Sequence, residues 1–310
     1  MRVLVTGAAG HLGRLAGARL AREHEVLGID VRAAPDAGFA VERLDVRDPA
    51  LAALVRDRAI EAVVHLAAVL ETSRDRARDF DIDVNGTANV LAAAVAGGVR
   101  HLTVSSSGAA YGYHADNPAW LREDHPLRGN AEVPYADHKR RVEALLAQAR
   151  ATHPALRQLV FRIGTVLGER VDSPMTALFH RPRLLAVRGS ASPFVFVWDE
   201  DVADAIAHGL QGEREGTYNL VGNGALEVSA IAAALGKPVL ALPAWLLAGA
   251  LAVGRPLAIT RYGPEQVRVL RYRPVLSNAR LRAEFGWAPR YDAAACLERF
   301  ARAQGLWKGP

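Results

Sequence analysis

The chain has 310 residues, enough for one large α/β domain or for two unequal lobes around a shared cleft. Half of the residues are hydrophobic, which excludes a wholly disordered chain. The net charge of +5 comes almost entirely from arginines, but these are interspersed with aspartate and glutamate and form no basic arm. The charge pattern therefore favours a solvated surface over a nucleic-acid site.

Several classes of protein are disfavoured by simple features. The chain has one cysteine, Cys296, so an intrachain disulfide is excluded. No cluster of cysteines and histidines predicts a metal site. We expect Cys296 to serve as a small apolar residue of a C-terminal helix. A strand begins almost at the first residue, which leaves no room for a signal peptide. The most apolar stretch, 239–259, is broken by proline and glycine and is too short to cross a bilayer. The sequence predicts a cytoplasmic protein without a membrane span.

In the first half of the chain, short apolar runs alternate with amphipathic stretches, which is typical of βαβ units and a parallel sheet. Nearly continuous apolar runs predict strands buried on both faces, at residues 2–7, 24–30, 40–46, 62–68, 99–107 and 157–164. Helical periodicity predicts helices at residues 12–23, 49–59, 85–98 and 135–151, the last of them after Pro134.

After residue 164 the pattern loosens into shorter elements. We expect a strand leading into a helix at 194–210, a strand at 216–222, and helices at 228–236, 278–286 and 291–304. The fold predicted is a Rossmann-type, doubly wound parallel sheet with a smaller mixed α/β C-terminal cap. We place the dinucleotide-binding domain at 1–164, with a later strand near 216–221 returning to it, and the substrate-binding cap at 165–310.

A glycine-rich turn, TGAAGHLG, lies between the first strand and the first helix. Gly7 permits a tight turn, Gly10 lets the backbone approach a pyrophosphate, and Gly13 allows close packing of helix on strand. The start of the helix then offers unpaired N–H groups and a partial positive charge to a diphosphate. This placement predicts a dinucleotide site.

The nature of the dinucleotide depends on Asp30, which ends the second predicted strand. A carboxylate there accepts hydrogen bonds from ribose hydroxyls and repels a 2′-phosphate. Arg32 is close enough to hold such a phosphate instead. We expect NAD, with NADP as the alternative.

A Tyr–Lys pair and a run of serines predict acid–base chemistry. Tyr135 and Lys139 are four residues apart and share one face of a helix, where the ammonium favours ionisation of the phenol. Ser107 ends the preceding strand, at the edge of the sheet where ligands bind in open α/β folds. Its hydroxyl can bond the same substrate oxygen as Tyr135.

With these motifs in this order, the chain resembles the extended short-chain dehydrogenases/reductases, in the NAD-dependent epimerase/dehydratase group. The resemblance covers nearly the whole chain and includes TGAAGHLG, LDVRD, HLAA, VNGT, SSSGAAYG, PYADHK, FRIGTVLG, WDEDVADAI, GTYNLVG and FGWAPRYD. It implies that Ser107 and Tyr135 polarise the reacting oxygen, that Tyr135 carries the proton and that Lys139 binds the nicotinamide ribose. It also implies that Asn85 supports the catalytic site. The implied cofactor-binding residues are Gly7, Gly10, His11, Leu12, Gly13, Asp30, Asp45, Val46, Leu66, Ala67, Ala68, Ser105, Tyr135, Lys139 and Ile163.

The sequence departs from the family where nucleotide sugars usually bind. Members acting on them carry an asparagine where this chain has Thr165, and an arginine before the segment that begins at Phe196, where this chain has 192–195 without a cation. Such losses remove charge-assisted hydrogen bonds to a diphosphate. We therefore expect Ser107, Thr165, Phe194 and Trp198 to contact the substrate in an apolar cleft, to which Phe196 and 244–253 also contribute.

Three functions stay open. The first is an NAD-dependent oxidoreductase or epimerase that transfers hydride at a secondary alcohol or ketone of a small molecule other than a nucleotide sugar. The second is a nucleotide-sugar 4-epimerase or dehydratase acting on UDP- or dTDP-sugars. The third is a dinucleotide-binding sensor without turnover, which the Ser–Tyr–Lys set disfavours. We expect a homodimer.

Overall fold

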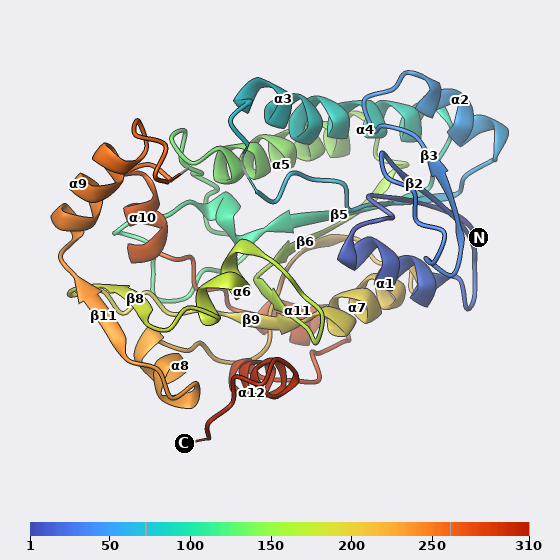
Figure 1. Cartoon of the computed structure of the whole chain (residues 1–310). Coiled ribbons are helices and arrows are strands. Elements are labelled where there is room, and N and C mark those ends of the chain that lie inside the picture. Colours follow the sequence, from blue (N-terminus) through green and yellow to red (C-terminus); the bar gives the residue numbers. More distant parts are fainter. Residues whose placement is uncertain (72, 261, 310) are drawn as a thin grey trace.

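A seven-stranded parallel sheet forms the centre of the molecule (Figure 1). The computed structural model describes residues 1–71, 73–260 and 262–309. The strands stand in the order β10-β6-β5-β4-β1-β2-β3. Their bounds are β1 Arg2–Thr6, β2 Glu25–Asp30, β3 Ala40–Arg43, β4 Ala62–His65, β5 His101–Ser107, β6 Arg157–Ile163 and β10 Gly216–Leu220. The predicted doubly wound sheet is confirmed, because all six early strands and the later one at 216–220 lie in it.

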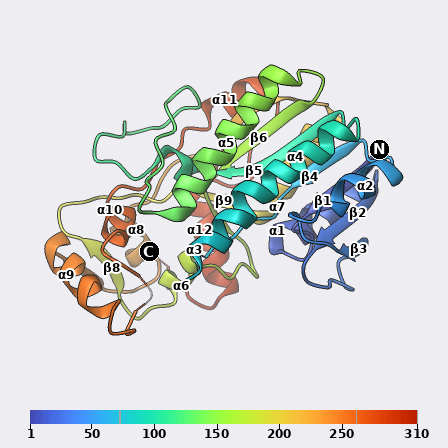
Figure 2. The same cartoon turned by 90° about the horizontal axis from the view of Figure 1, so that it is seen from above.

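Helices cover both faces of the sheet, which is why its central strands are apolar throughout (Figures 1 and 2). On one face lie α2 Ala50–Asp57, α4 Gly86–Ala96 and α5 Pro134–Thr152. The short helix α3 Arg76–Phe80 and the π-helical turn η1 Asp81–Asn85 lead directly into α4. On the other face lie α1 His11–Leu20, α7 Asp199–Gln211 and α11 Ala279–Glu284. The structure therefore returns α7 and α11 to the sheet as well as β10. The domain boundary at residue 164 stays a prediction.

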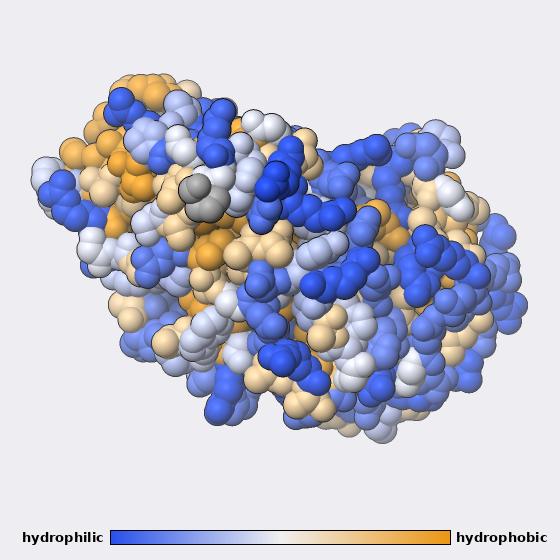
Figure 3. All heavy atoms as spheres, turned by 90° about the horizontal axis from the view of Figure 1, so that it is seen from below, coloured by the Kyte–Doolittle hydropathy of each residue, from blue (hydrophilic) through white to orange (hydrophobic). Residues whose placement is uncertain are grey.

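The remaining elements form a smaller lobe beside the carboxyl ends of the strands. Two parallel pairs of strands belong to it, β7 Thr165–Leu167 with β9 Phe196–Trp198, and β8 Leu184–Val187 with β11 Val239–Leu242. Its helices are α6 Pro174–Phe179, α8 Val228–Ala234, α9 Ala244–Gly254, α10 Gln266–Arg271 and α12 Ala293–Ala303. A 3₁₀ turn, η2 Gly108–Tyr111, follows β5. Apolar residues gather on the surface at one end of the molecule (Figure 3).

Cys296 and the apolar stretch 239–259 are both placed as the sequence predicts. Cys296 is buried in the core of the lobe on α12, and burial raises its pKa to about 12. The apolar stretch 239–259 folds as β11 and α9. Across the described residues, no helix is long and apolar enough to cross a membrane.

His65 is a buried polar residue at the end of β4, directly below the carboxyl edge of the sheet. Its Nε2 lies 2.9 Å from the Thr87 hydroxyl, which itself donates to the Asp83 carbonyl at 2.6 Å, so Nε2 carries the proton. Its Nδ1 then accepts from the Thr6 hydroxyl at 2.7 Å. The ring is neutral: burial, followed by the charge of Lys139, lowers its pKa to about 3.

We predict that His65 makes the fold sensitive to acid. An unfolded histidine binds a proton near pH 6.5 and the folded one does not until about pH 3, so stability falls as the pH drops below 6.5. Between pH 7 and pH 5 this loss is about 2 kcal/mol. Thermal unfolding of His65→Gln should show that much less pH dependence, whereas the exposed control His153→Gln should match the wild type. Equal pH dependence in all three proteins would contradict the assignment.

Candidate active site

A cavity of about 640 Å³ follows the carboxyl edge of the sheet and extends under the smaller lobe. The turns after β1, β2, β4, β5 and β6 line one part of it, which is where ligands bind in open parallel sheets. The lobe contributes residues 171–175, 193–195 and 273–274 to the other part. The described residues hold no group of His, Cys, Asp or Glu able to bind a metal ion.

The glycine turn has the shape that the sequence predicts. Gly7 has a φ of +68°, and a Cβ on it would lie 2.7 Å from the backbone nitrogen of Ala67. A Cβ on Gly13 would lie only 2.1 Å from the Gly7 carbonyl oxygen. Helix α1 begins at His11, and its first residues, 11–13, line the cavity together with this turn. These residues fit a dinucleotide diphosphate, which needs close backbone approach and unpaired donors.

Asp30 lies at the end of β2 in the same wall. One of its oxygens accepts from the Ala9 backbone at 3.1 Å, and the other from the Arg32 backbone at 3.0 Å. The Arg32 side chain is exposed and turns back to Asp30 at 3.4 Å. The carboxylate is therefore fixed at the site expected for a ribose, and Arg32 is already paired with it.

The catalytic residues predicted from the sequence meet in the middle of the cavity. Ser107, Tyr135 and Lys139 all line it. The ammonium of Lys139 donates to the Ser105 carbonyl at 2.8 Å and lies 5.8 Å from the centre of the Tyr135 ring. The Ser107 hydroxyl accepts from the Ala109 backbone at 3.2 Å, which leaves its proton free to donate.

All of the predicted cofactor-binding residues line the cavity. Besides the residues already described, these are His11, Leu12, Asp45, Val46, Leu66, Ala67, Ala68, Ser105 and Ile163. Asp45 is held by Arg47, whose Nη2 donates to it at 2.7 Å.

Asn85 is not brought to the site, which corrects the sequence analysis. Its side chain is exposed and donates to Asp81 at 2.8 Å. Asp83, two residues earlier in the π-helical turn, is buried instead and accepts from the Val69 backbone at 2.7 Å and from His138 at 2.8 Å. A π-helical turn changes the direction of the side chains that follow, which the apolar pattern of the sequence does not reveal.

Three of the four residues predicted to contact substrate, Ser107, Thr165 and Phe194, line the cavity, and Trp198 does not. Trp198 is buried among the apolar side chains of the lobe, against Tyr291 and Arg299. Four residues of extended chain span about 13 Å, enough to carry Trp198 away from the cavity that Phe194 reaches. Phe196 and α9 also lie outside the cavity lining.

Arg273 is a cation of the cavity that the sequence analysis missed. Its Nη1 donates to the carbonyl and the hydroxyl of Ser192, both at 2.9 Å, and its guanidinium lies 3.9 Å from the centre of the Phe194 ring. Segment 192–195 itself has no cation, but the fold brings Arg273 to it, so the expectation that this side of the cavity lacks a cation is wrong. Arg273 comes from 78 or more residues further along the chain, and no local pattern connects the two segments.

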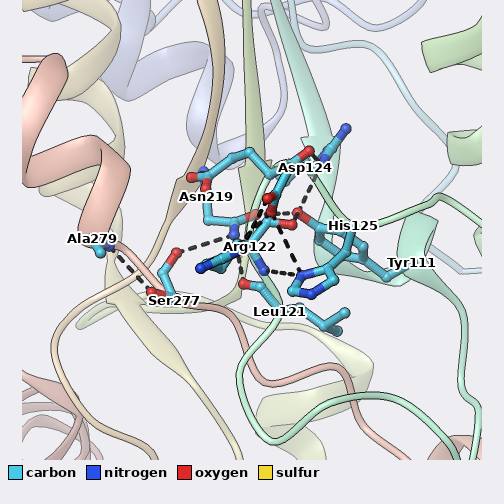
Figure 4. Close-up of polar contacts among 10 residues, drawn as sticks. Tyr111, Leu121, Arg122, Asp124, His125, Asn219, Ser277 and Ala279 are labelled. Atoms are coloured by element: carbon cyan, nitrogen blue, oxygen red, sulfur yellow. Dashed lines mark hydrogen bonds and ion pairs between the residues drawn. The ribbon is translucent and has the colours of Figure 1, made fainter.

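Segment 274–277 is fixed by Asn219 at the end of β10 (Figure 4). The amide of Asn219 donates to the carbonyls of Leu121 and Ser277 at 2.9 and 3.0 Å, and its oxygen accepts from Tyr111 at 2.9 Å. Ser277 in turn donates its backbone N–H to Leu121. These contacts hold the chain that follows Arg273 against the sheet.

Tyr113 is a second residue that the sequence analysis missed. It lines the cavity and packs with Tyr135 and Tyr272. Burial, followed by the charge of Tyr135, raises its pKa to about 12, and Arg273 opposes this rise. Tyr113 is thus within electrostatic range of both the catalytic phenol and the guanidinium.

Comparison with known proteins agrees with this site. Residues 3–220 match the model of the NAD dependent epimerase/dehydratase family. A UDP-glucose 4-epimerase of Mycolicibacterium smegmatis is 30% identical, over 95% of each chain. An uncharacterised protein of Mycobacterium tuberculosis is 24% identical, over 98% of this chain and 84% of its own. The structure of UDP-glucose 4-epimerase from Thermus thermophilus in complex with NAD superposes with a TM-score of 0.76 at 26% identity, over 98% of both chains.

The family match confirms the predicted enzyme class and its cofactor, NAD. Because the match covers the glycine turn, the serine strand and the Tyr–Lys helix together, this chain belongs to the NAD-dependent epimerase/dehydratase family.

Proposed function

We propose that this protein is an NAD-dependent epimerase of nucleotide-diphosphate sugars, which removes and returns a hydride at one secondary alcohol of the sugar. The observation that carries the proposal is Arg273, a cation in the same cavity as Ser107, Tyr135 and Lys139. The similarity to UDP-glucose 4-epimerases supports it as well. This proposal favours the second function left open by the sequence over the first.

Arg273 is suited to an anionic ligand because its charge has no anionic partner. Burial lowers its pKa to about 10, and no carboxylate within the described chain counters that shift. Its Nε has no hydrogen-bond partner among the described residues. A buried donor without a partner is unfavourable, and a phosphate oxygen would satisfy both the donor and the charge.

The residues of the other half of the cavity suit hydride chemistry at a carbon that carries a hydroxyl. Bound NAD supplies the hydride acceptor and donor. The chain's own part is to hold the dinucleotide with the glycine turn and Asp30, and to hold the substrate oxygen between Ser107 and Tyr135. Tyr135 takes the proton of that oxygen and returns it later. Lys139, fixed by the Ser105 carbonyl, holds its side-chain nitrogen beside the phenol.

A smaller alcohol or ketone is the second candidate, and the substrate half of the cavity favours it. Thr165 stands where family members acting on nucleotide sugars have an asparagine, and Ser192 stands close to where they have an arginine. Among the described residues that the lobe contributes to the cavity, Arg273 is then the one cation, and it suits a single carboxylate or phosphate group as well as a diphosphate. The homodimer and the cytoplasmic location also remain predictions.

We predict that Arg273→Gln weakens UDP binding to the NAD-loaded protein by about ten- to hundredfold, because one charged hydrogen bond contributes about 1.5–3 kcal/mol. Calorimetry measures this, together with epimerisation of UDP-glucose followed by product analysis. Arg271→Gln is a matched control, since Arg271 lies at the end of α10 and outside the cavity lining. Absence of UDP binding in the wild type would contradict the nucleotide-sugar proposal and favour the smaller substrate.

We predict that Tyr135→Phe lowers turnover by about 10²- to 10⁴-fold, the usual contribution of an acid–base group, while NAD affinity stays close to that of the wild type. The ring remains in place and only the proton carrier is lost. Lys139→Met should lower both turnover and NAD affinity. Retention of most activity in Tyr135→Phe would show that another group transfers the proton.

We predict tighter binding of NAD(H) than of NADP(H), because Asp30 would face a 2′-phosphate with like charge. Asp30→Asn should reduce the preference by about tenfold, which corresponds to about 1.4 kcal/mol. Fluorescence titration with both cofactors measures the ratio, and the exposed Asp36→Asn is the control. A preference of the wild type for NADP(H) would mean that Arg32 dominates this part of the site.

A further inference from the structure

Helix α9 is apolar on its outer face as well as on its inner face. Leu247 and Leu251 point inward and pack with Val187 and Val267. The opposite face carries Trp245, which is 75% exposed, together with Leu246, Gly249, Ala250 and Val253, which is 60% exposed. A surface helix of a globular protein normally has a polar outer face, and a helix that is apolar all round is covered by a core or a membrane.

The exposed apolar area continues beyond the helix. Leu257 and Ile259 follow it and are 63% and 77% exposed, and Val239 and Leu240 of β11 precede it. We call these residues, with Trp245, Leu246 and Val253, the α9 surface. Apolar atoms gather at this end of the molecule (Figure 3). Contiguous exposed apolar surface of this kind marks an interaction site.

The lobe that carries the α9 surface is also strongly basic. Its segments 173–198 and 228–275 contain nine arginines and lysines but a single acidic residue, Glu265, a net charge of +8. Because the whole chain has a net charge of +5, the rest of it carries −3. The arginines occur all along the sequence, but most acidic residues lie outside the lobe, so the net positive charge is concentrated in the lobe. The sequence pattern alone did not reveal this.

Several of these charges have no anionic partner. Arg181, Arg183 and Arg188 flank β8, the strand that pairs with β11, and their side chains are exposed. None of the three makes an ion pair within the described part of the chain. Arg188 lies next to the start of α9, since its backbone N–H donates to the Leu242 carbonyl at 2.9 Å. Arginine combined with exposed tryptophan and aliphatic side chains is typical of surfaces that bind the membrane interface.

We infer that the α9 surface binds the face of a bilayer that contains anionic phospholipids. Helix α9 has 11 residues, about 16 Å at 1.5 Å per residue, so it lies in the interface instead of crossing a hydrocarbon core of about 30 Å. Its apolar side chains enter the boundary between headgroups and acyl chains, and the basic lobe is attracted by the lipid charge. The inference does not rest on the proposed substrate.

The charge of the lobe favours a lipid surface over a second copy of the chain. Two copies that met through the α9 surface would bring two lobes of net charge +8 together, and like charges at an interface oppose association. An anionic bilayer offers apolar depth and opposite charge at once.

Sedimentation of the purified protein with lipid vesicles tests the inference. We expect binding to vesicles of phosphatidylcholine and phosphatidylglycerol at low salt, and much weaker binding to phosphatidylcholine alone or at high salt. Trp245→Ser/Val253→Ser should weaken binding about tenfold or more by removing apolar contact area. Arg183→Gln/Arg188→Gln should weaken it by about fivefold for each arginine, since one such charge contributes about 1 kcal/mol.

Trp120→Ser is the matched control, because Trp120 is 46% exposed on a loop outside the lobe. It should bind vesicles like the wild type, and all variants should retain NAD binding, so that a folding defect is recognised. Failure of the wild type to bind anionic vesicles would overturn the inference. Equal binding by the wild type and the Trp245→Ser/Val253→Ser variant would also overturn it. A third contrary result would be a wild-type dimer in light scattering that becomes a monomer in this variant, with lipid binding unchanged.

Discussion

Polar contacts along one face of α5 fix the catalytic helix to the sheet, and the geometry of the site depends on them. Tyr135, Lys139 and Glu143 are spaced four residues apart, so they lie above one another on the same face. Lys139 donates to the Ser105 carbonyl, and Glu143 accepts from the Ser106 hydroxyl at 2.5 Å. Tyr135 is thereby placed in the cavity wall that Ser107 also forms.

Glu143, the last of these three residues, also forms a buried ion pair with Arg162. Glu143 accepts from Arg162 of β6 at 2.8 Å, and Arg162 also donates to Tyr111 at 2.7 Å. Burial lowers the pKa of Arg162, but the contact with Glu143 outweighs this and raises it above its ordinary value, so Arg162 stays charged. Removing one partner of such a pair usually costs about 3–5 kcal/mol, because the other charge is left buried. Tyr111 links the pair to Asn219 and so to the segment that follows Arg273.

One connected set of contacts therefore positions both halves of the cavity. The cofactor half is built on the sheet edge, which strands buried on both faces make rigid. The substrate half is built from three segments of the lobe, and Asn219 of β10 anchors the chain that follows one of them, residues 273–274, to the sheet. The same lobe turns Arg273 into the cavity and the α9 surface outward.

Local patterns in the sequence predicted the strands of the sheet, the glycine turn and the Tyr135–Lys139 pair, because each depends on neighbours a few residues apart. Gly7 and Gly13 are required by contacts within one turn, and Tyr135 and Lys139 share a face through the helical period alone. The other placements depend on contacts between elements that are distant in the sequence. A π-helical turn directs Asn85 to the surface and buries Asp83, and the extended chain carries Trp198 away from the cavity. Arg273 reached Ser192 across 81 residues because strand β10 and Asn219 hold its segment against the sheet. Contacts of that length depend on the packing of whole elements, which no local pattern of residues encodes.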